Sequence, residues 1–162
     1  MSYSLIIVLI LLFLLVSYLL GASRYSKRLI HIGLTAAQSY AYYGDKASLY
    51  AYLTVFSRLS NFNKSRLINY TNVISSSVKD NDAFDSASLT KRVEEIISMA
   101  SLIKTGVKEK MYYKELLSSI SKEWLLAINK LDVELANDLF QKELSKSILQ
   151  ELKDKPQSNK TK

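Results

Sequence analysis

Few residues of this 162-residue chain have the types and the spacing that catalysis or metal binding requires. His31 is the only histidine, and no carboxylate lies within twelve residues of it along the chain. A histidine that acts as a general base needs a nucleophile and a group that orients its ring. We therefore interpret His31 as an interfacial, solvent-facing side chain and not as a catalytic one.

One run of acidic residues has part of the spacing of a calcium-binding loop. Asp80 and Asp82 could begin such a loop, which needs oxygen ligands at positions 1, 3 and 5, glycine at position 6 and glutamate at position 12. Counted from Asp80, position 5 is Phe84, position 6 is Asp85 and position 12 is Lys91, so the pattern fails at all three. We interpret the segment as a solvated acidic loop that caps the next helix.

The chain also lacks the residues that other kinds of catalytic site need. Glu94 and Glu95 are adjacent, so on a helix they diverge by about 100° and cannot form a facing carboxylate pair. The chain has no cysteine, which excludes a thiol nucleophile, a zinc–thiolate site and a disulfide framework. We therefore predict no catalytic, metal or cofactor site, and we expect that the protein is not an enzyme.

The strongest pattern in the chain is an apolar run near its amino terminus. Residues 5–20 contain no charge and no proline, and Gly21 and Ala22 extend the run. A helix that crosses the hydrocarbon core of a bilayer takes about 17–25 residues. We therefore predict a transmembrane anchor over residues 1–23, with Tyr18 in the aromatic belt at the membrane edge.

Positive charges on one side of this run predict the topology of the chain. Arg24, Lys27 and Arg28 follow the run, whereas residues 1–4 contain no Lys or Arg. Lys and Arg close to a membrane segment tend to stay in the cytoplasm, which predicts an outside amino terminus and a cytoplasmic carboxy-terminal domain. The alternative is a signal peptide cleaved near Gly21-Ala22-Ser23, although the positive start of such a peptide is missing.

The net charge of +7 is concentrated next to the predicted anchor. Residues 24–75 carry seven cations and one acid, whereas the rest of the chain carries 15 cations and 14 acids. Each Lys or Arg near an anionic leaflet contributes about 1 kcal/mol of attraction. A membrane-proximal basic surface therefore explains the charge, and we expect no nucleic-acid partner because no recognised binding module is visible.

The rest of the chain has the apolar periodicity of helices. Apolar residues recur at three- and four-residue spacing, and four glycines and one proline leave few breaks. The first helix should run over residues 4–43, end at Gly44 and be followed by a helix capped by Asp45. A break is expected at 129–132, and the last stripe runs on through Phe140, Leu144, Ile148 and Leu152.

These patterns predict an all-α protein with one transmembrane helix that continues into an antiparallel bundle of about four to five helices. The predicted regions are an anchor at 1–23, a basic juxtamembrane helix at 24–44, a helical bundle domain at 45–153 and a disordered polar tail at 154–162.

Tyrosine is unusually frequent, with eleven residues in the chain. Aromatic rings near Lys46 and Arg58 could stack on bases, but tyrosine also supplies large contact area in cores and partner interfaces. We favour packing or an interface. The partner-interface candidates are Tyr40, Tyr43, Tyr50, Tyr52 and Trp124.

Together these features predict a single-pass, membrane-anchored interaction protein, most concretely an accessory or scaffold subunit of a membrane complex. Its expected partners are the lipid bilayer and other protein subunits. Ser17 and Gly21 form a small-xxx-small pair that leaves a homo-oligomer open. The alternatives are a secreted or surface helical factor with a cleaved signal peptide, and a phage- or plasmid-type membrane exclusion or lysis-control protein.

Overall fold

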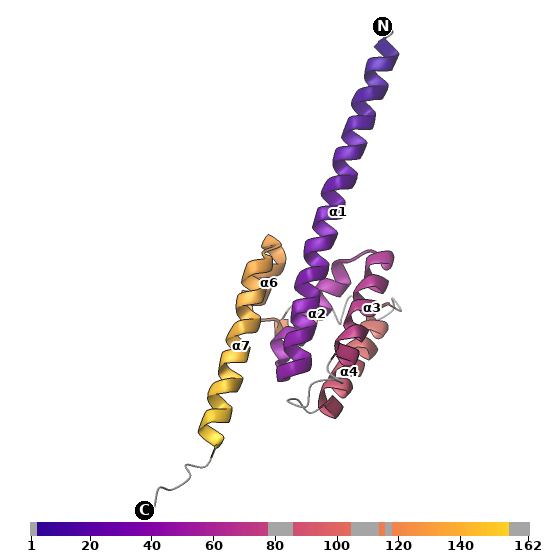
Figure 1. Ribbon diagram of the computed structural model, residues 1–162. Coiled ribbons are helices and arrows are strands. Elements are labelled where there is room, and N and C mark those ends of the chain that lie inside the picture. Colours follow the sequence, from indigo (N-terminus) through magenta and orange to yellow (C-terminus); the bar gives the residue numbers. More distant parts are fainter. Residues whose placement is uncertain (1–2, 78–85, 105–113, 116–117, 156–162) are drawn as a thin grey trace, which may run out of the picture.

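The computed structural model describes residues 3–77, 86–104, 114–115 and 118–155. Over these residues the fold consists of helices without strands, which confirms the predicted all-α class. The amino-terminal half of the first helix projects alone, and the other helices pack around its carboxy-terminal half (Figure 1). The helices are α1 (Tyr3–Tyr43), α2 (Lys46–Arg58), α3 (Asn61–Ser77), α4 (Ser86–Lys104), α6 (Lys122–Lys130) and α7 (Val133–Asp154).

The projecting half of α1 is mainly apolar, and none of the described helices packs around it. Every side chain from Leu5 to Leu20 is exposed, and the helix contains an 18-residue window of mean hydropathy 3.0 with none of it buried. The helix is therefore long and apolar enough to span a membrane. A signal sequence near an amino terminus shares this length and composition.

Burial in α1 begins abruptly at Leu29. Leu29, Ile32 and Ala36 are fully buried and Tyr40 nearly so, which confirms the apolar face expected from their spacing. The bundle core therefore includes side chains of α1 from Leu29 to Ala41.

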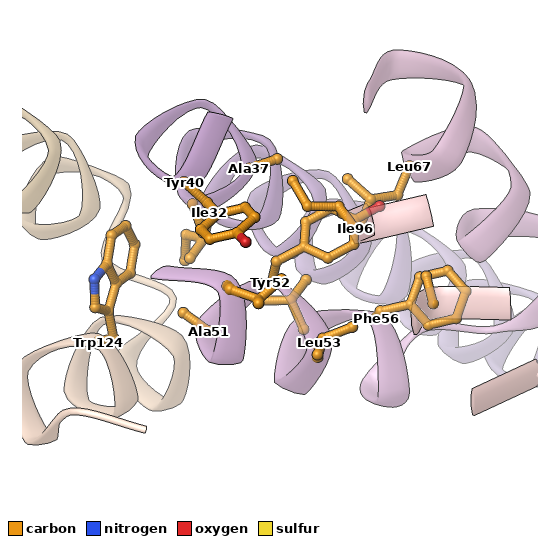
Figure 2. Packing of buried hydrophobic residues seen from close by; sticks show 14 of the residues in the cluster. Ile32, Ala37, Tyr40, Ala51, Tyr52, Leu53, Phe56, Leu67, Ile96 and Trp124 are labelled. Atoms are coloured by element: carbon orange, nitrogen blue, oxygen red, sulfur yellow. The ribbon is translucent and has the colours of Figure 1, made fainter. Parts of the chain in front are cut away.

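The core forms where α2, α3 and α4 pack against this part of α1. Tyr52 and Phe56 of α2 stack with ring centroids 6.3 Å apart, and they lie among Leu67 of α3 and Ile96 of α4 (Figure 2). Close packing of α1 requires Gly33, because a β-carbon there would meet side chains of both α2 and α3. Burial of these large side chains supplies the main favourable free energy of the fold.

The turn between α1 and α2 has the residues that the sequence pattern assigned to it. Gly44 has a φ of 67°, a left-handed conformation that glycine adopts without steric cost. The Asp45 carboxylate accepts a hydrogen bond from the Ala47 amide at 3.1 Å and caps α2. Arg92 of α4 closes the same corner by donating from Nη1 to the Ala41 carbonyl oxygen at 3.0 Å.

The expected break at 129–132 separates α6 from α7. Leu131 adopts a left-handed conformation with a φ of 53°, and Asp132 caps α7 by accepting from the Leu135 amide at 3.0 Å. Helix α7 then runs beside α1, where Thr35 Oγ1 lies 3.4 Å from Asn137 Oδ1. The predicted acidic loop at 79–85 and residues 156–162 of the predicted polar tail at 154–162 lie outside the described residues. The first residue assigned to that tail, Asp154, is instead the last residue of α7.

Candidate functional site

The candidate membrane-interface residues lie on the part of α1 that links the apolar segment to the bundle. Arg24, Lys27 and Arg28 are exposed, and no helix of the bundle covers them. Tyr18, on the apolar segment itself, is also exposed. The three cations are therefore accessible from outside the protein at the point where the apolar segment joins the bundle.

Three of the partner-interface candidates belong to the core. Tyr52 is fully buried, Trp124 is 3% exposed and Tyr40 is 6% exposed. A partner could reach these side chains only if the bundle opened. Their burial therefore assigns them to internal packing, the other interpretation that the tyrosine pattern allowed.

The two buried tyrosines keep their hydroxyl groups satisfied. Tyr40 donates to Glu95 Oε2 at 2.7 Å, and burial together with this hydrogen bond raises the pKa of Tyr40 to about 12. Tyr52 Oη lies 3.0 Å from Thr71 Oγ1, which itself donates to the Leu67 carbonyl oxygen at 2.7 Å. Tyr52 is therefore the donor of the pair, and burial raises its pKa to about 12.

Tyr43 and Tyr50 are half-buried and remain at the surface. The Tyr43 ring lies 5.7 Å from the Phe140 ring of α7, so it joins the end of α1 to α7. Burial raises the pKa of the Tyr43 hydroxyl. Of the five aromatic candidates, these two are the ones that a partner could contact without opening the core.

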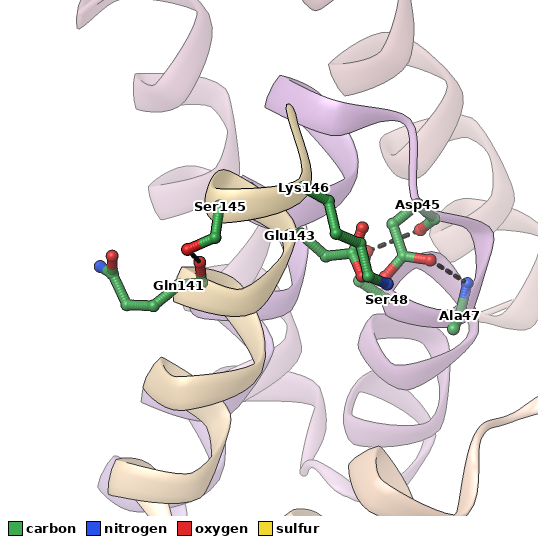
Figure 3. A network of polar contacts seen from close by, with 7 residues as sticks. All are labelled: Asp45, Ala47, Ser48, Gln141, Glu143, Ser145 and Lys146. Atoms are coloured by element: carbon green, nitrogen blue, oxygen red, sulfur yellow. Dashed lines mark hydrogen bonds and ion pairs between the residues drawn. The ribbon is translucent and has the colours of Figure 1, made fainter. Parts of the chain in front are cut away.

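Shallow depressions between α7 and the α1–α2 corner are lined by charged side chains. One of them has a volume of about 400 Å³ and includes Tyr42, Tyr43 and Glu151 in its lining. Figure 3 shows Glu143 and Lys146 of α7 beside the start of α2, with Lys146 Nζ 2.6 Å from Glu143 Oε1. This hydrogen bond raises the pKa of Lys146. This ion pair lies within α7, three residues apart, so it stabilises that helix rather than its contact with the corner.

The described residues contain no metal or histidine-based site. Within them, no group of three or more His, Cys, Asp or Glu side chains is placed to hold a metal ion. His31 is exposed, as the sequence pattern led us to expect.

Periodicity could not identify the exposed apolar faces of α7 and α3. Ile148, Leu149 and Leu152 on α7 are 49–61% exposed, although two of them continue the helix stripe that sequence reasoning expected. On α3, Phe62 and Val73 are also exposed. What distinguishes the exposed apolar side chains of α7 from buried ones is their place along the helix, because α7 continues past the end of α1 (Figure 1).

Comparisons with models of protein families, with curated proteins and with solved structures found no match for this chain.

Proposed function

We propose that the chain is a single-pass, membrane-anchored interaction protein, an accessory or scaffold subunit of a membrane complex. The observation that carries this proposal is the division of α1, one continuous helix. Its first half exposes uncharged, mainly apolar side chains, and its second half is the central helix of the bundle core. An anchor of this kind would be joined to the bundle by one continuous helix, without a flexible linker.

The proposed topology places the amino terminus outside and the bundle in the cytoplasm. Support comes from Arg24, Lys27 and Arg28, which are exposed directly after the apolar segment. Positive residues close to a span favour the cytoplasmic side. The length of the apolar run supports an anchor over a signal peptide, whose apolar region spans about 7–15 residues.

The distal part of α7, defined as residues 144–154, is the proposed surface for the partner subunit. Tyr43, the last residue of α1, contacts Phe140, so the distal part of α7 continues beyond the helix that it packs on. There Ile148, Leu149 and Leu152 expose apolar side chains. Exposed apolar groups that gather on one face of a domain favour a protein contact.

The anchor is tested by washing membranes at alkaline pH and sequencing the amino terminus of the retained protein. We expect the chain to stay in the membrane fraction with its first residue at Met1 or Ser2. A mature chain that begins at Ser23 or Arg24 and leaves the membrane would replace this proposal with the secreted helical factor. The secreted factor is the second candidate function, because a signal sequence near an amino terminus has the same length and apolar composition as a membrane span.

The partner surface is tested in living cells with a photo-crosslinking amino acid at Leu149. We expect one crosslinked membrane protein to predominate, and we expect the double variant Leu149→Asp, Leu152→Asp to lose its co-purification. Gln150→Asp is the matched control, because Gln150 is exposed and polar on the same turn of α7. Retained co-purification in the double variant would remove α7 as the binding surface.

A further inference from the structure

Several helix ends of the bundle meet around Arg28 of α1. Helix α2 ends at Arg58, whose Nη1 donates to Asn129 Oδ1 near the end of α6 at 2.9 Å. A depression of about 470 Å³ joins Arg28 to residues 130–134, the turn between α6 and α7. These ends lie where the apolar half of α1 leaves the bundle (Figure 1). We call this surface the membrane-facing end and define it as Arg28, residues 58–62 and residues 130–134.

The start of α3 lies at the same level. A β-carbon at Gly33 would be 2.9 Å from Val55 Cγ1 and 3.1 Å from Leu67 Cδ2, so Gly33 and Leu67 lie side by side. Phe62 precedes Leu67 by five residues, as Arg28 precedes Gly33. At 1.5 Å per residue, both are about 7.5 Å nearer to the apolar segment. Phe62 and Arg28 therefore lie at one depth.

This depth lies at the outer edge of the headgroup layer of a bilayer that α1 would cross, within reach of long side chains that extend toward the lipid. Arg28 follows Ala22, the end of the apolar run, by six residues, which is about 9 Å of helix. A bilayer is about 40–45 Å thick with a hydrocarbon core of about 30 Å, which leaves roughly 5–8 Å of headgroups on each side. The membrane-facing end would therefore meet the headgroups, without a linker between it and the lipid.

Phe62 points toward the same layer. Its side chain is 73% exposed, although it is a large apolar group on the first turn of α3. Side chains on a helix tilt toward its amino terminus, which for α3 is the end nearer the apolar segment. The Arg66 guanidinium carbon lies 5.9 Å from the centre of the Phe62 ring. An apolar ring next to a cation suits an interface that is apolar inside and charged outside.

The charged side chains of residues 24–75, the basic part of the chain, lie at different distances from the apolar segment according to their sign. Asp45, the only acid of residues 24–75, lies with Lys46 at the opposite end of the bundle, after α1 ends. The turn at 130–134 adds one lysine, Lys130, and two acids, Asp132 and Glu134, so the end as a whole remains positive. The remaining accessible cations of residues 24–75 lie at or near the membrane-facing end: Arg24, Lys27, Arg28, Arg58 and Arg66. Lys64 is buried, with its Nζ 5.5 Å from the centre of the Phe56 ring, and takes no part in this surface.

We propose that the membrane-facing end docks on an anionic lipid leaflet, with Phe62 in the headgroup layer and the surrounding cations on lipid phosphates. This inference rests on the proposed function, because it requires α1 to remain in the bilayer. Docking fixes the tilt of the bundle and directs the distal part of α7 away from the membrane. The partner subunit would then approach from the cytoplasmic side of the bundle.

The test uses the full chain, which has no native cysteine, reconstituted in vesicles. Phe62→Cys and Val73→Cys each carry a nitroxide spin label. Val73 is the matched control, because it is an exposed apolar residue on the same helix, eleven residues and about 16 Å further from the bilayer. Vesicles contain phosphatidylcholine alone or phosphatidylcholine with phosphatidylglycerol. Relaxation by oxygen and by a neutral nickel chelate reports the depth of each label.

We expect the label at position 62 to favour oxygen over the nickel chelate in anionic vesicles and to lose this preference in neutral ones. The label at position 73 should remain accessible to the chelate in both. Arg58→Gln with Arg66→Gln should lower the equilibrium constant for lipid contact at position 62 by about thirtyfold. Equal accessibility at 62 and 73 in anionic vesicles would overturn the inference.

Two further results distinguish anionic-lipid docking from self-association and from docking that does not depend on lipid charge. Protection at position 62 that disappears when protein is diluted with lipid would assign the surface to a second copy and overturn lipid docking. Equal protection in neutral and anionic vesicles would overturn the charged leaflet as the partner. Retention after an alkaline wash tests the anchor separately, so loss of the protein from the vesicles would instead contradict the proposed function.

Discussion

Gly33 of α1 lies so close to Val55 of α2 that a β-carbon at position 33 would be 2.9 Å from Val55 Cγ1. The β-branched valine has one strongly preferred side-chain rotamer in a helix, so it cannot easily move aside. Leu67 Cδ2 of α3 would be 3.1 Å away on the same side. The absence of a side chain at Gly33 therefore lets three helices approach one another.

Gly33→Ala should destabilise the bundle. Alanine gains about 1 kcal/mol of helix propensity over glycine, but overpacking of a well-packed core costs about 1–3 kcal/mol. We expect a net loss of about 1 kcal/mol, measured as the free energy of unfolding in detergent by circular dichroism. Gly21→Ala is the control, because nothing lies within 4 Å of a β-carbon there. A Gly33→Ala chain as stable as the control would contradict this contact.

Arg92→Met should loosen the corner between α1 and α2. Arg92 Nη1 donates to the Ala41 carbonyl oxygen at 3.0 Å and to the Tyr42 carbonyl oxygen at 3.4 Å. These carbonyl groups near the end of α1 have few helical partners, and a cation there also interacts favourably with the helix dipole. We expect a loss of about 1–3 kcal/mol of unfolding free energy. Exposed Lys91→Met should change it by less than about 0.5 kcal/mol, and similar losses in both variants would argue against the cap.

Local sequence patterns predicted the elements of this fold because their causes are local. The spacing of Leu29 and Ile32 requires one buried helix face, and Gly44 with Asp45 supplies a left-handed residue and a cap at adjacent positions. The break before Asp132 likewise follows from short-range capping. Each of these features depends on residues within about one helical turn.

The exposure of individual apolar side chains could not be predicted from the sequence, because it depends on where the neighbouring helices end. Ile148 and Leu152 have the spacing of a buried face, yet α1 ends before it could cover them. Tyr52 and Trp124 could serve equally in a core or an interface, and only the packing of α2 and α6 places them inside. Periodicity identifies an apolar face of a helix and does not identify what covers it.

Alkaline pH should destabilise the bundle through its buried tyrosines. The pKa of Tyr40 and that of Tyr52 are raised from 10.0 to about 12, chiefly by burial. The unfolded chain therefore releases these protons at a lower pH than the folded chain. The associated stability is fully present below pH 10 and is lost as the pH rises toward 12.

Tyr40→Phe and Tyr52→Phe should each reduce this alkaline loss of stability. The measurement is the free energy of unfolding at several values below and above pH 10. Tyr52→Phe should also lower stability at neutral pH by about 1 kcal/mol, because the buried hydrogen bond that Tyr52 donates to Thr71 is lost. Tyr25→Phe, an exposed position outside the bundle, is the control. An unchanged alkaline slope in both buried variants would show that other groups carry the pH dependence.

The proposed topology predicts which cysteines are accessible in intact cells. The chain has no native cysteine, so single replacements can be labelled without background. Ser98→Cys, at an exposed position of α4, should react with an impermeant thiol reagent only after lysis, whereas Ser2→Cys should react in intact cells. Positive residues near the span hold the bundle inside in this interpretation.

Reversing the charge bias should reverse this labelling. Three lysines added before residue 5, together with replacement of Arg24, Lys27 and Arg28 by Gln, move the positive charges to the other side of the apolar segment. We expect Ser98→Cys to become partly reactive in intact cells, because Lys and Arg counted near a span set its orientation. The neutral replacements alone, without the added lysines, are the control. Labelling of Ser98→Cys from outside with all native charges present would place the bundle on the outer face, and the partner of α7 would then lie on that side.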